Sequence, residues 1–159
     1  MRFFMRAPTG LSRCLGRSFF AGATLAAALA FSARAEVDLS KLPPPSPKTG
    51  ATYAADIRPI FEVSCFRCHG ADRQRGRLRL DSLEAALKGG EDGRVIEPGD
   101  SAKSSLVIAV ARLDPDEAMP PIRKGGPGGP PPSGNHPPAR PLTADEVGLI
   151  RAWIDQGAK

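Results

Sequence analysis

The chain has 159 residues, enough for one domain with extensions, and 41% of them are hydrophobic but only 6% aromatic. It contains 22 Lys and Arg against 17 Asp and Glu, and five of the basic residues but none of the acidic ones lie in the first 35 positions. The rest of the chain therefore holds 17 charges of each sign, which excludes a nucleic-acid-binding function based on net charge.

Residues 1–35 have the pattern of a secretory signal peptide. Four arginines without an acidic neighbour precede an apolar run over 19–31, and Ala33-Arg34-Ala35 is a small-x-small cleavage pattern. The run is shorter than the roughly 20 residues that a membrane-spanning helix needs. We expect cleavage, a periplasmic or otherwise exported protein, and no stable membrane span afterwards; retention of the segment as an anchor is the alternative.

Residues 36–51 are predicted to be a Pro-rich linker. The run Leu42-Pro43-Pro44-Pro45-Ser46-Pro47 favours extended polyproline geometry, and we expect it not to fold. The domain is expected to occupy residues 52–159.

A helix is predicted over 53–64. Ile57, Ile60, Phe61 and Ser64 fall on one face at helical spacing. Pro59 fits best in the first turn, with Asp56 or a neighbour as the cap.

Three further helices are predicted, which makes the expected fold all-α. Asp81-Ser82 caps a helix over 83–88 that ends at Gly89-Gly90. A helix at about 102–112 has its apolar face at Leu106, Val107 and Val110. The last helix begins at Thr143, where Glu146 completes a capping box, and Gly157 ends it. Its buried stripe is predicted to be Val147, Ile150, Trp153 and Ile154, and the Gly/Pro-rich insert at 124–141 is predicted to be a mobile surface loop.

The chemistry is concentrated in Cys65-Phe66-Arg67-Cys68-His69. At helical spacing the two cysteines and the histidine share one face, so that two thiols can attach to the two vinyl groups of a porphyrin and the imidazole lies beneath the iron. A disulfide or redox Cys-x-x-Cys motif and a zinc site are the alternatives; the chain lacks a thioredoxin-like setting, and adjacent Cys68-His69 suits a tetrahedral zinc site poorly. The pattern predicts one covalent haem c, held by Cys65 and Cys68 with His69 as an iron ligand.

The second axial ligand is predicted to be Met119. Without residues 1–35 it is the only methionine, and it lies in a polar, turn-like context before Pro120-Pro121. His/Met ligation raises the reduction potential and suits electron transfer. His136 and an open sixth position are the alternatives.

The Cys-x-x-Cys-His motif is generic to c-type cytochromes, but the wider chain resembles a narrower group, the planctomycete-type cytochrome c domain. The resemblance covers nearly all of residues 53–158. It rests on ordered blocks: Phe61 to Gly70, Gly76 to Ser82, Lys88-Gly89-Gly90, Pro98-Gly99-Asp100, Ser104-Ser105-Leu106, Met119-Pro120-Pro121 and Trp153 to Ala158. It implies a small cytochrome c-like helical domain around one covalent haem, with His69 and Met119 as axial ligands and an electron-carrying role.

We therefore expect an electron carrier rather than an enzyme, monomeric and serving redox protein partners. A haem-based enzyme or sensor with a labile sixth ligand, and a module docked to a periplasmic dehydrogenase, are the alternatives. Leu78, Leu80 and Leu106 are the predicted haem-packing residues, which ordinary core packing would equally explain. Arg79 is the preferred partner of a haem propionate within the basic run Arg73, Arg75, Arg77 and Arg79, and a solvated basic face is the alternative for the other three.

Overall fold

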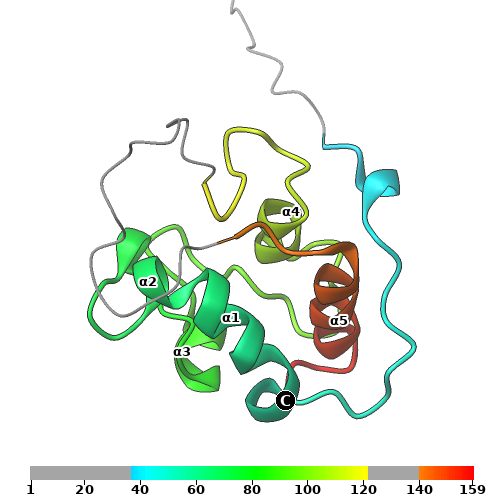
Figure 1. Cartoon of the computed structure of the whole chain (residues 1–159), viewed down its shortest axis with the longest axis horizontal. Coiled ribbons are helices and arrows are strands. Elements are labelled where there is room, and N and C mark those ends of the chain that lie inside the picture. The colour runs from blue at the N-terminus through cyan, green and yellow to red at the C-terminus, as the bar shows by residue number, and fades with distance from the viewer. Residues whose placement is uncertain (1–36, 122–139) are drawn as a thin grey trace, which may run out of the picture. The chain divides into compact units, whose positions relative to one another are not determined.

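The computed structural model describes residues 37–121 and 140–159. The predicted signal peptide at 1–35 and all but the last two residues of the predicted loop at 124–141 lie outside these ranges. The described residues form helices and turns without a β-strand, as predicted (Figure 1). The elements are η1 (Leu39–Lys41), η2 (Tyr53–Ile57), α1 (Arg58–Ser64), α2 (Phe66–His69), η3 (Arg75–Arg77), α3 (Leu83–Lys88), α4 (Ser105–Val110) and α5 (Ala144–Asp155). None of the helices described is long and apolar enough to cross a bilayer.

The predicted helix over 53–64 consists of η2, a wide π-helical turn, followed directly by α1. Thr52 caps it by accepting a hydrogen bond from the Ala55 backbone, and Asp56 Oδ2 accepts one from the Thr52 backbone at 3.0 Å. Pro59 lies in the first turn of α1, where its missing N–H costs no hydrogen bond. The predicted buried face of this helix is confirmed, since Ile57, Ile60, Phe61 and Ser64 are all buried.

The core lies where this first helix packs against α5. Trp153, Phe61 and Ile57 are fully buried there, and the Tyr53 ring lies 6.1 Å from the Trp153 ring and 6.4 Å from the Phe61 ring. The Tyr53 hydroxyl donates to the Leu80 carbonyl at 2.7 Å. This bond joins the aromatic core to the segment between α2 and α3.

Helix α3 has the predicted bounds, with Ser82 as its cap and Gly89 after its last residue. Helix α4 is shorter than predicted. Residues 101–103 form a turn instead of helix, because Asp100 Oδ1 accepts from the Lys103 N–H at 3.1 Å and the Asp100 carbonyl accepts from the Ser104 hydroxyl at 3.0 Å. The predicted apolar face of α4 is buried as expected.

Helix α5 begins and ends at the predicted signals. Thr143 Oγ1 accepts from the Glu146 N–H, and the Glu146 carboxylate accepts from the Thr143 N–H at 2.8 Å, which completes the capping box. Arg140 adds a bidentate ion pair to Glu146, which lowers the pKa of Glu146 to about 2. The chain leaves the helix at Gly157, where φ is 96°.

The Pro-rich segment does not behave as the free linker that its composition predicts. Residues 43–50, which we call the arm, lie along α5 (Figure 1). The Ser46 N–H donates to the Gly148 carbonyl at 2.9 Å, and the Arg151 guanidinium donates to the Pro43 carbonyl. Helix α5 thus offers the arm a carbonyl acceptor at Gly148 and a donor at Arg151. The predicted linker also contains η1, so the expected lack of fixed structure does not hold for these residues.

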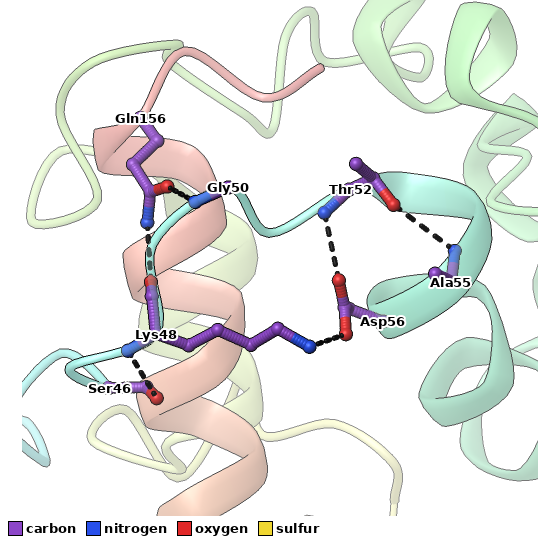
Figure 2. A network of polar contacts seen from close by, with 7 residues as sticks. All are labelled: Ser46, Lys48, Gly50, Thr52, Ala55, Asp56 and Gln156. Carbon is purple, nitrogen blue, oxygen red and sulfur yellow. Dashed lines mark hydrogen bonds and ion pairs between the residues drawn. The ribbon is translucent and has the colours of Figure 1, made fainter.

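The arm ends in a polar network (Figure 2). Gln156 bridges two points on it, accepting from the Gly50 N–H at 2.6 Å and donating to the Lys48 carbonyl at 2.9 Å. The Lys48 ammonium forms an ion pair with Asp56, which also binds the Thr52 N–H. The start of the first helix is thereby linked to the end of α5.

Candidate functional site

The Cys-x-x-Cys-His motif lies at the junction of α1 and α2. Cys65 interrupts the helix with φ −122° and ψ −39°, although its N–H still donates to the Phe61 carbonyl at 2.7 Å. The N–H groups of Cys68 and His69 both donate to the Cys65 carbonyl at 2.9 Å. One tight turn thus brings the backbones of the two cysteines and the histidine together.

Both cysteines of the motif are free thiols. Cys65 is buried, and burial, with a smaller contribution from Cys68, raises the pKa of the Cys65 thiol to about 12. A redox-active Cys-x-x-Cys motif needs a thiol whose pKa is lowered, so Cys65 has the opposite environment. Nor do the described ranges contain a cluster of three or more His, Cys, Asp and Glu residues arranged around a metal ion.

His69 presents a partly buried imidazole. Burial lowers its pKa; the backbone of Leu78 and Arg75 opposes this shift, and the charge of Arg75 adds to it. Its Nδ1 is buried and has no hydrogen-bond partner among the described residues. A neutral imidazole is the form that coordinates a metal.

The backbone around His69 is held by the segment that follows it. The Leu80 N–H donates to the His69 carbonyl at 2.7 Å, and the Gly70 N–H donates to the Arg73 carbonyl at 2.9 Å. A Cβ on Gly70 would lie 2.5 Å from the Phe66 carbonyl oxygen, and one on Gly90 would lie 2.5 Å from the Gly76 carbonyl oxygen. These two glycines are supporting residues that motif spacing alone does not reveal.

The predicted packing leucines belong to one cluster with Cys65. Leu80 and Leu106 are 1% and 7% exposed, and Leu78 is half-buried against the same cluster. Leu80 reaches the motif, since its N–H donates to the His69 carbonyl, and the haem-packing role of all three leucines stays a prediction.

The Arg79 side chain is paired with a carboxylate of the chain itself, whereas its predicted partner is a haem propionate. Its guanidinium forms a bidentate pair with Asp81, with Nε to Oδ1 at 2.9 Å and Nη2 to Oδ2 at 2.7 Å. This pair lowers the pKa of Asp81. A propionate would have to share or displace Asp81, so pairing with Arg79 stays a prediction.

Met119 is held at the end of α4. Its N–H donates to the Ala109 carbonyl at 2.9 Å, and Arg112 Nη1 donates to the Pro120 carbonyl at 2.7 Å. Its side chain is 38% exposed. Within the described residues, the hydrogen bonds that fix residues 119–120 lead to the α4 region and not to the Cys-x-x-Cys-His motif. The rival ligand His136 lies outside the described ranges.

These residues fit a covalently attached haem. Two unbonded thiols and an imidazole with an unpartnered, buried nitrogen occupy one turn, and apolar side chains pack beside them. Cys65 and Cys68 would hold the porphyrin, and His69 would bind the iron.

Comparison with known proteins agrees with this assignment. Residues 65–122 match the family model described as Planctomycete cytochrome C. The matched stretch begins at Cys65 and includes His69, α3, α4 and Met119. Neither the curated proteins nor the solved structures include a match to the chain. The chain is therefore similar to the planctomycete cytochrome c family over residues 65–122, which are 58 of its 159 residues.

Proposed function

We propose that this protein is an exported c-type cytochrome with one haem, which carries single electrons between redox partners. Cys65 and Cys68 attach the haem, and His69 and Met119 bind the iron. The observation that carries the proposal is the turn at 65–69, where free thiols and a neutral imidazole occur together inside the family-matched segment.

The chain's own residues account for the remaining requirements of a carrier. The bound haem supplies a reversible one-electron couple. The buried Cys65 and Leu80, whose N–H donates to the His69 carbonyl, keep water from one side of the motif, which tunes the potential. The Leu80 N–H binds the His69 carbonyl, and the Gly70 N–H binds the Arg73 carbonyl, so the backbone at His69 is fixed. Little reorganisation of this backbone would therefore accompany a change in the charge of the iron.

The mass of the mature protein tests attachment and export together. Expression in a host with haem c maturation machinery is expected to give a chain that starts at Glu36 and carries one haem. Cys65→Ala/Cys68→Ala is the matched control and is expected to have the mass of the same chain without haem. A haem-free wild-type mass from this host would contradict the proposal.

A second candidate function is a sensor or haem enzyme with a labile sixth position. It is favoured by the hydrogen bonds at Met119 and Pro120, which hold the backbone to the α4 region and leave the Met119 side chain unconstrained by them. Carbon monoxide added to the reduced protein separates the two functions: slow or absent binding indicates a carrier, and rapid binding indicates an accessible iron.

A further inference from the structure

The segment after the motif carries an unusual concentration of positive charge. Residues 66–80 contain five arginines and one acidic residue, Asp72. Arg79 is paired with Asp81, but Arg73, Arg75 and Arg77 are exposed and form no ion pair within the described residues. We call these three residues the arginine face.

The arginine face is tied directly to the motif. The Arg73 carbonyl accepts a hydrogen bond from the Gly70 N–H, and Gln74 pairs with His69 in an isolated antiparallel β-bridge. The Leu78 N–H donates to the Arg75 carbonyl at 3.2 Å, and two residues later Leu80 binds the His69 carbonyl. A molecule bound to the arginine face would therefore lie next to His69, the predicted iron ligand.

The three arginine side chains add no ion pair to the described residues, although the backbone of their segment supports His69. Three like charges at alternating positions repel one another, and Arg77 adopts φ 54°, a left-handed conformation that costs a residue with a side chain roughly 1 kcal/mol. Local features that oppose stability are expected at functional sites. The three arginines are therefore better explained by something they bind than by anything they stabilise.

The positive charge of this face is a local concentration, because the chain after residue 35 holds 17 charges of each sign. A charged partner would be oriented by such a concentration before contact.

Acidic side chains interrupt the positive surface. Asp72 precedes the arginine face, and Glu91, whose N–H donates to the Gly76 carbonyl at 2.8 Å, and Asp92 lie exposed beside it. A uniformly anionic surface such as a lipid headgroup layer would be repelled at these points. A protein can place basic groups opposite them.

We propose that the arginine face is the docking surface for an acidic redox protein, which exchanges electrons with this domain from the His69 side. The inference rests on the proposed electron-carrier function and names the kind of partner that function would use.

The test uses the haem-loaded, full mature chain in stopped-flow measurements. Reduced plant-type ferredoxin serves as an acidic electron donor to the oxidised protein, and hexacyanoferrate(III) serves as an anionic small oxidant of the reduced protein. Arg73→Glu/Arg75→Glu/Arg77→Glu is expected to slow both second-order rates about tenfold at low salt, with the difference disappearing at high salt. A cationic cobalt(III) oxidant is expected to react no more slowly with the variant than with the wild type.

A control variant carries the same change of charge elsewhere. Lys41→Glu/Lys103→Glu/Lys159→Glu alters the arm side, the turn before α4 and the C-terminus, and is expected to change the ferredoxin rate less than twofold. Equal slowing in both variants would show a net-charge effect and overturn the docking surface. Haem content and thermal midpoint, measured on each variant, separate loss of docking from loss of folding.

Two other outcomes would also overturn the inference. An unchanged ferredoxin rate in a haem-loaded arginine variant at low salt would remove the docking surface but leave the carrier function intact, whereas absence of haem in the wild type would remove both. Binding to phosphatidylglycerol vesicles that is lost with the three arginines, without an effect on the ferredoxin rate, would assign the face to a membrane surface instead.

Discussion

Two buried polar atoms near the motif have no hydrogen-bond partner among the described residues, the Ser64 hydroxyl and His69 Nδ1. An unsatisfied buried polar group costs about 1–3 kcal/mol. Such groups are expected where function rather than packing determines the side chain. Their position on either side of Cys65 marks this turn as the place where the chain departs from maximal stability.

At the scale of single residues, Met119 is the most testable of the proposed ligands. Met119→Ala is expected to lower the reduction potential by about 0.1 V or more, because axial ligands control potentials over a span of about 0.8 V. The near-red absorption band of Met-ligated ferric haem should disappear with it. Leu39→Ala, at another exposed apolar side chain, is the control and should leave both unchanged. A potential and a spectrum identical to those of the wild type would assign the sixth position to another group.

At the scale of elements, a local capping box determines where α5 begins. The Thr143–Glu146 capping box satisfies backbone donors at the first turn, and Arg140 fixes the carboxylate by Nη2 to Oε1 at 2.5 Å. Because α5 carries Trp153 into the core, the cap supports the element against which η2 and α4 pack.

Removal of this cap has a predictable cost. Thr143→Ala is expected to lower the free energy of unfolding of the haem-loaded protein by about 1 kcal/mol, since it deletes the acceptor of the Glu146 N–H bond. Denaturant titration measures the loss. Thr143→Ser keeps the hydroxyl and should retain most of the stability; an equal loss in both variants would show that the hydrogen bond is not the cause.

The same cap predicts a pH dependence. The pKa of Glu146 falls from 4.5 to about 2 on folding, so its stabilising contribution is complete above about 4.5 and is lost as the pH falls towards 2. Glu146→Gln is expected to be less stable than the wild type at neutral pH, with the difference shrinking through that window. Asp145→Asn removes a neighbouring carboxylate as the control. A difference that stays constant between pH 5 and about 2 would exclude the ion pair as its source.

The helices could be predicted because their signals are local. Thr143 with Glu146, Ser82 with Gly89, and the spacing of Ile57, Ile60 and Phe61 act within one or two turns and need no knowledge of the rest of the fold. The motif residues could be named for the same reason.

The features that sequence reasoning missed depend on partners far along the chain. The arm is fixed by Arg151 and Gln156, more than a hundred residues away. The spacing of Arg79 and Asp81 is compatible with the ion pair that they form. The sequence alone does not distinguish this carboxylate from a haem propionate as the partner of Arg79. Met119 stays a prediction because its distance from His69 depends on tertiary packing rather than on any local pattern.

At the scale of the whole molecule, the arm joins parts of the fold that the sequence keeps apart. It is held to α5 by backbone-directed bonds, and Gly148 allows the approach because a Cβ there would lie 2.7 Å from the Pro44 carbonyl oxygen. The arm is therefore a component of the domain and not only a connection to it.

A substitution at Gly148 tests this directly. Gly148→Ala improves helix propensity by about 1 kcal/mol but collides with Pro44, so the chain is expected to lose about 1 kcal/mol of unfolding free energy overall and to be cut more readily within the arm by protease. In a chain lacking residues 36–47 the same substitution should instead stabilise. A stabilising effect in both backgrounds would show that the arm does not rest on α5.

The arm also determines how the domain would respond to mechanical load. A pull on the N-terminal side would reach the contacts of Pro43, Ser46 and Lys48 with α5 before it reached the first helix. These bonds would share the tension, and the turn at Cys65 would feel it only after they had broken. Residues 43–48 would thus bear a load applied at the N-terminal side before the turn that holds the proposed iron ligand does.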